Sequence, residues 1–286
     1  MRAAVLLAFA ALAAGCGSAE KSSLEEAAEA TEADTSRFEM DYVLTGIPAK
    51  KSFTMTANGL FDFPKERGVM SVQGDFATLA GLAEDVEFKE FRLLGNVGYA
   101  RWTIKGKEYW VKDDVDDQIG DPSELLIPLP GTPTQPTDVL ARVVRASVEN
   151  AEVANEEVRG TETTHFRARV DLEKLVEQLP PSERPNDASV RSRPQFVPVD
   201  VWVDGENRLR RITMEQKQDD STFSTRFDLF DYGVDVEVEQ PSDNVISQEQ
   251  FEKLTADSKG PYSLRAGEGE VVTPEEPGQP GNKESE

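Results

Sequence analysis

The feature of this sequence that most constrains its fold is a two-residue alternation of apolar and polar side chains, which recurs along most of the chain. Phe38, Met40, Tyr42 and Leu44 alternate with polar residues, a pattern that is typical of a β-strand with one buried face. Further alternating or β-rich segments occupy residues 53–57, 69–72, 86–93, 97–104, 108–111, 161–170, 197–203, 209–214, 223–229 and 234–238. Short turns such as 204–207 separate many of them, so the strands are predicted to pair antiparallel.

Two segments follow a helical period instead. Apolar residues recur at helical spacing over 138–147, and Thr137 before them is a suitable N-cap. Residues 171–179 form a second, short helical segment that ends at two prolines. Within the strand at 86–93 the alternation slips at Glu90, which predicts a β-bulge. The sequence therefore predicts an α+β protein with about nine or ten antiparallel strands and two to four helices.

The first fifteen residues have the layout of an export signal. Arg2 is their only charged residue, and residues 5–14 are apolar or small. This stretch is too short to cross a bilayer, which takes roughly 20 apolar residues, but its basic start, apolar middle and small-residue end are typical of a secretory signal. One reading is a plain secretory signal cleaved near Ala14.

The residues that end this signal support a second reading. Ala13, Ala14, Gly15 and Cys16 resemble the lipobox of bacterial lipoproteins, although Ala13 stands where leucine is usual. The resemblance implies cleavage before Cys16, a diacylglycerol on its thiol and acylation of the new amine, for example by palmitate. Two or three acyl chains anchor a protein stably. We therefore expect a lipid-anchored protein on the extracytoplasmic side of the cell membrane.

The segments on either side of the alternating region are predicted not to fold. Leu24 is the only large apolar residue between 17 and 37, which leaves no apolar helix face to pack. We expect residues 16–35 to form the lipidated cysteine and a flexible or transiently helical acidic stalk. Residues 256–286 are rich in Gly, Pro and Glu and are predicted to be a disordered tail. A single domain over 36–255 remains.

Composition excludes several functions. With 31 basic and 54 acidic residues, the formal charge of −23 argues against binding nucleic acid through its phosphates. One cysteine and one histidine exclude an intrachain disulfide and a zinc site built on a histidine pair. The acidic run at 113–117 lacks the glycine and closing glutamate of a calcium loop. No metal site or cofactor is predicted. His165 has no nucleophile motif beside it, so we expect it to be structural and the protein not to be an enzyme.

Four segments in the second half resemble the LppX/LprA/LprF/LprG lipoprotein family of actinobacteria. They are EVRGTETTHFR at 157–167, VDVWVD at 199–204, NRLRR at 207–211 and FDYG at 230–233. The resemblance implies the fold of the LolA/LolB carriers, in which a curved antiparallel half-barrel wraps helices and encloses an apolar cavity. It also implies a protein that binds or carries acylated glycolipids and related lipids in the cell envelope, with an envelope transporter as a possible partner.

The side chains expected to line such a cavity are those on the apolar face of the strands and those of one proline-rich loop. They are Phe38, Met40, Tyr42, Phe53, Met55, Val86, Phe88, Leu125, Ile127, Val199, Val201, Phe223 and Phe227. The loop at 119–136 is expected either to act as a lid or membrane-touching lip or to pack over the sheet edge. The same alternation also fits a filled core, so a cavity-less envelope interaction or sensor lipoprotein stays open as the alternative.

Overall fold

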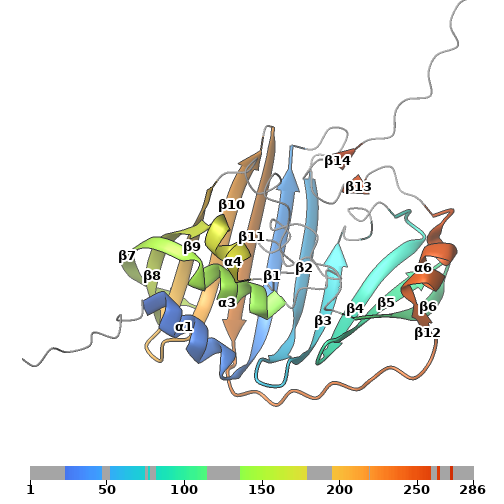
Figure 1. The fold of residues 1–286 in the computed structure, drawn as a ribbon, viewed down its shortest axis with the longest axis horizontal. Coiled ribbons are helices and arrows are strands. Elements are labelled where there is room, and N and C mark those ends of the chain that lie inside the picture. Colours follow the sequence, from blue (N-terminus) through green and yellow to red (C-terminus); the bar gives the residue numbers. More distant parts are fainter. Residues whose placement is uncertain are drawn as a thin grey trace, which may run out of the picture.

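A computed structural model describes residues 23–46, 52–74, 77, 82–114, 136–178, 195–218, 220–258, 263–264 and 271–272. Most of its strands belong to one curved sheet, and its helices lie at the two ends of that sheet (Figure 1). The helices are α1 (Ser23–Glu32), α3 (Pro136–Arg145), α4 (Leu172–Glu177) and α6 (Gln248–Thr255). The predicted α+β class is confirmed.

The sheet contains twelve strands, in the spatial order β12-β6-β5-β4-β3-β2-β1-β11-β10-β9-β8-β7. Because β12 and β7 stand at opposite ends of this order, the sheet is open and not a closed barrel. Every pairing is antiparallel except that of β12 with β6. The strands are β1 (Thr35–Thr45), β2 (Ser52–Asp62), β3 (Arg67–Gly74), β4 (Val86–Leu94), β5 (Val97–Ile104), β6 (Lys107–Asp114), β7 (Ser147–Val158), β8 (Thr161–Asp171), β9 (Phe196–Asp204), β10 (Leu209–Gln218), β11 (Ser221–Phe230) and β12 (Val245–Ser247).

The predicted irregularity in β4 is present. The register between β4 and β5 shifts between Phe88 and Glu90, which confirms the bulge. After the bulge Glu90 accepts hydrogen bonds from Arg92 Nε (2.7 Å) and Arg101 Nη2 (2.8 Å). The extra residue therefore turns a carboxylate toward two guanidinium groups while Phe88 stays buried.

The sheet has an apolar inner face, and ring contacts between neighbouring strands define it. Phe38 of β1 stacks on Phe227 of β11 with centroids 5.3 Å apart, and Tyr42 meets Phe223 edge-on at the same distance. Phe38 also occupies the space beside Gly59 of β2. A Cβ at Gly59 would lie 2.0 Å from the Val69 carbonyl oxygen and 2.9 Å from Phe38 Cε1. The glycine is required because strand and ring approach too closely for any side chain.

The expectation of a flexible stalk is wrong for residues 23–32, which form α1. Leu24, Ala27, Ala28 and Thr31 recur at helical spacing and are buried. α1 packs on α3 and reaches β10, where Leu209 N donates to Thr31 Oγ1 (2.9 Å). Alanines allow the helix to approach its neighbours closely, so one leucine and two alanines provide enough apolar surface. The rest of the expected stalk and the export signal lie outside the described residues.

The C-terminal boundary also differs from the expected position. Ser258 is 2% exposed, its carbonyl accepts from Ala83 N (3.0 Å), and its hydroxyl donates to Asp85 (3.3 Å). Beyond it, β13 (Ser263–Leu264) pairs antiparallel with β14 (Val271–Val272). The folded domain therefore continues past residue 255, and the expected disorder is wrong for these residues. The remainder of the predicted tail lies outside the described residues.

The strand predicted at 234–238 is wrong. These residues belong to an extended connection, 231–244, which runs along the margin of the sheet from β11 to β12 (Figure 1). Hydrogen bonds fix it to β1 and β6: Thr35 Oγ1 donates to the Val234 carbonyl (2.6 Å), and Trp110 N donates to the Asn244 carbonyl (3.0 Å). Alternating valines here indicate an extended chain, but the ladder partners of a strand are missing.

Candidate functional site

The inner face of the sheet brings together eleven of the thirteen predicted lining residues. Ten of them are buried and Phe223 is half-buried. They lie on β1 (Phe38, Met40, Tyr42), β2 (Phe53, Met55), β4 (Val86, Phe88), β9 (Val199, Val201) and β11 (Phe223, Phe227). Leu125 and Ile127 lie outside the described residues, as does the rest of the predicted lid loop except Pro136, the first residue of α3.

At the β4–β6 end, part of this face is a filled core. Trp102 of β5 lies 4.9 Å from Phe88 and 5.0 Å from Phe251 of α6, measured between ring centroids. α6 begins with a capping box between Ser247 and Gln250, which holds the helix start beside β12. Phe88 therefore packs against a neighbouring ring here, and packed side chains fill this end of the inner face.

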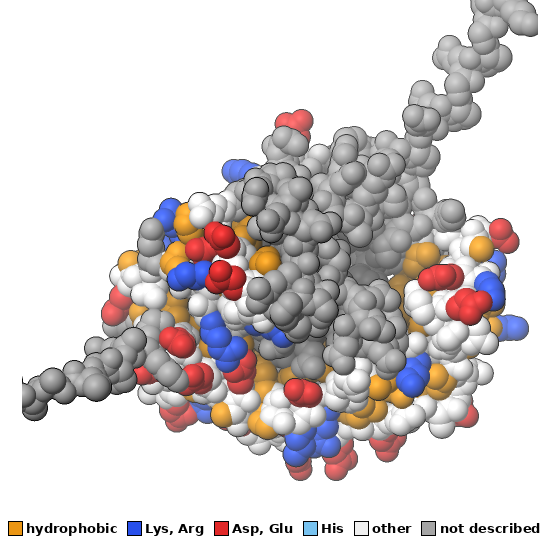
Figure 2. Space-filling model, viewed as in Figure 1, with side chains coloured by type: hydrophobic (Ala, Val, Ile, Leu, Met, Phe, Trp, Pro, Cys, Tyr) orange, Lys and Arg blue, Asp and Glu red, His pale blue; other side chains and the backbone are white. Residues whose placement is uncertain are grey.

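The helices at the opposite end cover β8 and β10. α1 and α3 pack together, and α4 contacts α3 and β8. Asp171 caps α4 by accepting from Glu173 N (3.0 Å) and Lys174 N (3.3 Å). On the face seen in Figure 2, hydrophobic side chains (orange) are exposed among acidic and basic ones towards both the left-hand and the right-hand end of the molecule.

Between the two ends, β2, β1 and β11 carry four of the largest fully buried side chains of the inner face. Phe53, Met40, Met55 and Phe227 are each at most 1% exposed. Tyr42 lies among them, and burial raises the pKa of its phenol well above the ordinary value. Its side chain is therefore a neutral phenol at all physiological pH values. This central, apolar part is the candidate functional site.

The outer face of the sheet is polar, and its best-buried acid is Asp228. Arg211 Nε and Nη2 donate to its two carboxylate oxygens (2.6 and 2.8 Å), and Arg159 Nε adds a third bond (3.0 Å). Burial by itself raises the pKa of Asp228, but these hydrogen bonds and charges outweigh it and hold the pKa below the ordinary value. The sequence analysis missed this cluster, because nothing in the pattern pairs Arg159 with a residue 69 positions away.

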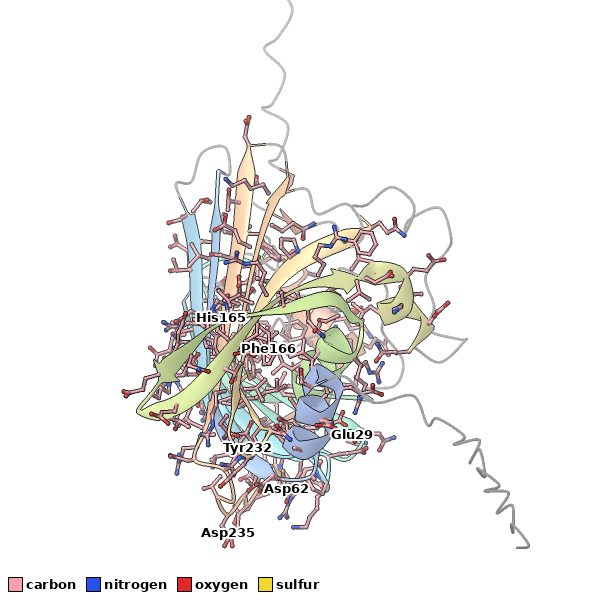
Figure 3. The ribbon with its side chains drawn as sticks, turned by 90° about the vertical axis from the view of Figure 1, so that its left-hand side faces the viewer. Glu29, Asp62, His165, Phe166, Tyr232 and Asp235 are labelled. Carbon is pink, nitrogen blue, oxygen red and sulfur yellow. The ribbon has the colours of Figure 1, made fainter. Side chains whose placement is uncertain are left out.

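His165 lies on the same outer face, beside Phe166 on β8 (Figure 3). Its ring stacks on Trp202 with centroids 4.2 Å apart. Its Nε2 is 2.7 Å from Asp200 Oδ1 and its Nδ1 is 3.2 Å from Glu156 Oε1. The Trp202 indole donates to Glu156 (2.9 Å), and this bond is the main cause of the lowered pKa of that carboxyl. Among the described residues, no group of three or more His, Cys, Asp or Glu side chains is placed to hold a metal ion.

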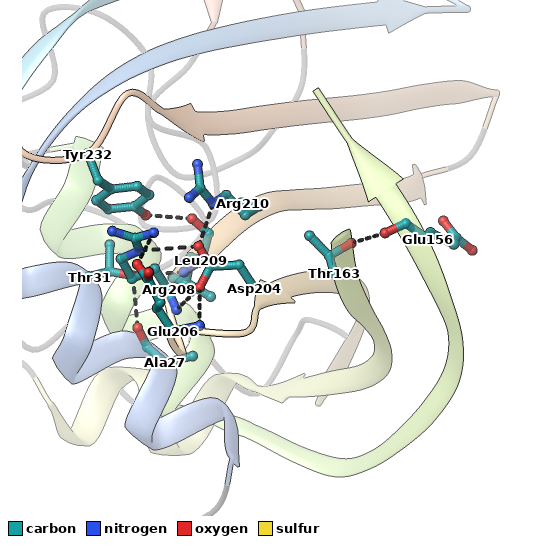
Figure 4. A network of polar contacts seen from close by, with 10 residues as sticks. All are labelled: Ala27, Thr31, Glu156, Thr163, Asp204, Glu206, Arg208, Leu209, Arg210 and Tyr232. Carbon is teal, nitrogen blue, oxygen red and sulfur yellow. Dashed lines mark hydrogen bonds and ion pairs between the residues drawn. The ribbon is translucent and has the colours of Figure 1, made fainter. Parts of the chain in front are cut away.

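A second polar cluster joins α1 to the β9–β10 hairpin (Figure 4). Asp204 accepts from the backbone N–H groups of Glu206 and Arg208 (both 2.9 Å) and from Arg210 Nε (2.7 Å). Burial acts to raise the pKa of Asp204, yet these bonds lower it on balance. The Tyr232 hydroxyl donates to the Leu209 carbonyl. The cluster fixes the hairpin against α1 and is structural.

One pocket outlined by described residues has a volume of about 350 Å³. Its lining consists of Arg37, Phe38, Asn58, Gly59, Leu60, Val69, Ser71 and Phe230. Most of these side chains alternate with the buried ones along β1, β2, β3 and β11, so the pocket opens on the outer face. It is not the acyl-chain cavity expected from the sequence. In the described part of the chain, no helix is both long and apolar enough to cross a membrane.

No family model matches the chain. An uncharacterised 31.2 kDa protein from the rplA–rplJ intergenic region of Streptomyces griseus is 25% identical over 194 residues, which are 63% of this chain and 62% of that protein. Among solved structures, LprF of Mycobacterium bovis is 14% identical, with a TM-score of 0.40 over 77% of this chain and 95% of LprF. The lipoprotein LppX of Mycobacterium tuberculosis is also 14% identical, with a TM-score of 0.37 over 76% and 96% of the two chains. Both belong to the lipoprotein group that the sequence resembles, and the likeness is one of fold alone.

Proposed function

We propose that this protein is a membrane-anchored, extracytoplasmic lipoprotein that binds acylated lipids or glycolipids and carries or presents them in the cell envelope. The observation that carries the proposal is the apolar inner face of an open sheet, where Met40, Phe53, Met55 and Phe227 are buried side by side. An acyl chain is best solvated by such a surface. Transferring a fourteen-carbon chain from water is worth about 10 kcal/mol at about 0.8 kcal/mol per CH₂, before the costs of ordering ligand and protein are subtracted.

The anchor would be the diacylated Cys16. Six residues, 17–22, separate it from α1, and an extended chain spans at most about 3.6 Å per residue. Cys16 would therefore lie within about 25 Å of the start of α1. This short tether would keep the domain at the membrane surface, where the proline-rich loop at 119–136 would act as the lid or the lip through which lipid enters.

The alternative is an envelope interaction or sensor lipoprotein of the same fold without a cavity. The contacts of Trp102 with Phe88 and Phe251 favour it at one end of the sheet, because rings in direct contact leave no room for an acyl chain. If the central strands are filled in the same way, the protein would act through its surface.

The two functions are separated by lipid loading. The full-length chain carrying Cys16→Ser is purified, incubated with envelope lipid extract, desalted and examined by native mass spectrometry, followed by denaturing solvent extraction. We expect a bound lipid of defined mass at near-stoichiometric level. A protein that stays empty would contradict the carrier function and leave the interaction role. Deleting residues 119–136 should slow loading if this loop is a lid, and an unchanged rate would refute that role.

A further inference from the structure

We infer that the hydroxyl of Thr225 binds the ester carbonyl of an acyl lipid on the inner face of the sheet. This inference rests on the proposed lipid-binding function and specifies its ligand: an uncharged acyl ester rather than a bare hydrocarbon or a free fatty-acid anion.

The position of Thr225 follows from the strand register. Thr225 of β11 lies directly opposite Tyr42 of β1 and Met214 of β10. The row that these pairs belong to crosses seven strands, and its members are Gly74, Met55, Tyr42, Thr225, Met214, Val199 and Ala168. Five of the seven have apolar side chains or none, so the only two hydroxyl groups stand side by side near its middle. Residues directly opposite on one face have Cβ atoms about 5 Å apart.

The hydroxyl of Thr225 is buried and unsatisfied. The residue is 5% exposed, and its Oγ1 has no hydrogen-bond partner in the described structure. Other buried threonines do have one: Thr163 donates to the Glu156 carbonyl (2.7 Å) and Thr255 to the Phe251 carbonyl (2.9 Å). A buried hydroxyl without a partner is unfavourable, because nothing replaces the hydrogen bonds that it made with water. A ligand that accepts a hydrogen bond from Thr225 would explain why an unsatisfied hydroxyl lies in the middle of the inner face.

The surroundings select the chemistry of that partner. A hydroxyl donates well to a carbonyl oxygen, and no member of the row carries a charge that would balance a carboxylate. Burying an unpaired carboxylate costs much more than burying an ester. Met214, directly opposite Thr225, and Met55, on the far side of Tyr42, have flexible side chains that adapt to chains of different shape. The row therefore fits an ester carbonyl at Thr225 with its acyl chain extending over a methionine.

The test compares three ligands of equal chain length. Protein carrying Cys16→Ser is incubated with an equimolar mixture of methyl tetradecanoate, sodium tetradecanoate and tetradecane, desalted and extracted, and the retained ligands are measured by gas chromatography. We expect the ester to be retained in excess over both competitors. Adding Thr225→Val should lower the ratio of ester to alkane about fivefold, the usual effect of one hydrogen bond.

Two further variants control for folding and for loss of any buried hydroxyl. Thr225→Ser keeps the donor and should keep the ratio. Ser36 is also buried on the same face, and its Oγ is also unsatisfied, but it lies six residues from Tyr42 along β1, about 20 Å away. Ser36→Ala should therefore leave the ratio unchanged. An unchanged ratio in Thr225→Val, or a preference for the free acid, overturns the inference while the carrier function stands. If the protein that carries only Cys16→Ser retains none of the three ligands, both the role of Thr225 and the proposed lipid-binding function are refuted.

Discussion

At the residue scale, a few buried polar and glycine positions hold the sheet in its shape. Asp228 on the outer face accepts hydrogen bonds from Arg211 of β10 and from Arg159 in the turn after β7. Gly59 on the inner face leaves the space that Phe38 fills. The two residues act by different physical means, one by hydrogen bonding to charge and the other by absence of a side chain, so their substitutions should have different signatures.

Replacing Asp228 by asparagine should destabilise the protein in a pH-dependent way. Its pKa in the folded protein lies below the ordinary value, so the carboxylate stabilises the fold above about pH 4 and this contribution disappears as the pH falls through the folded pKa. Asp228→Asn should lower the free energy of unfolding at pH 7 by about 2 kcal/mol. Urea denaturation at pH 7 and at pH 3 should show that the difference in unfolding free energy from the parent protein shrinks at the lower pH.

The control for this prediction is Asp231→Asn. Asp231 lies in an exposed pair with Arg37, so this change should alter stability little. A loss of stability in Asp228→Asn that did not depend on pH would contradict the charge argument.

Adding one methyl group at Gly59 should be more harmful than adding it at an open glycine. The new Cβ would lie 2.0 Å from a backbone oxygen of β3, which can be relieved only by moving a strand. We expect Gly59→Ala to lower the unfolding free energy by more than about 2 kcal/mol. Gly205→Ala, where nothing lies within 4 Å, should shift it by less than about 0.5 kcal/mol. Thermal unfolding measures both, and equal shifts would refute the close approach of β2 and β3.

At the element scale, packing decides which segments fold. α1 has weak apolar patterning, but Leu24, Ala27 and Ala28 are fully buried against neighbouring elements. β7 is an edge strand, and most of its side chains are exposed, Val153 to 47%. Its glutamates protect the open edge from pairing with another chain. α1 and β7 are both rich in polar residues because one large face of each element is exposed to solvent.

Leu24 is the residue that distinguishes a docked α1 from a flexible stalk. Leu24→Ala removes a side chain that is 0% exposed, so it should lower the unfolding free energy by about 2–4 kcal/mol. Glu26→Ala changes an exposed position of the same helix and serves as the control. Chemical denaturation of the Cys16→Ser chain with each change provides the measurement. If Leu24→Ala were as stable as the control, α1 would not belong to the folded domain.

At the scale of the whole molecule, the protein is an open sheet with helices packed near each of its two ends. Its N-terminal helix follows closely on the proposed anchor. With a formal charge of −23, the chain is repelled by anionic lipid headgroups. Membrane attachment by the protein surface is therefore disfavoured, and it should depend on acyl chains at Cys16. Residues 17–22 would then hold the folded domain close to the membrane surface.

Cys16→Ser should release the protein from the membrane. Without the thiol no diacylglycerol can be attached, and the acidic domain has little affinity for the bilayer of its own. Fractionation of the producing cells by ultracentrifugation should move the protein from the membrane pellet to the supernatant. Ser18→Ala, two residues further on, leaves the thiol intact and should stay in the pellet. A Cys16→Ser protein that remained in the pellet would refute lipidation at this position.

The sequence by itself determined the sheet, because burial on one face imposes a two-residue period that survives in strands such as β1, β9 and β11, and even the slip at Glu90 was readable as a bulge. It also determined which side chains face inward, since register cannot change without turning all of them to the other face. Only the tertiary structure decided whether segments with weak apolar periodicity form helices or strands. Thr31 receives a hydrogen bond from a residue 178 positions away, and residues 234–238 alternate like a strand but find no ladder partner. Long-range partners leave no local period in a sequence, so α1, β7 and the Asp228 cluster became visible only once the chain was folded.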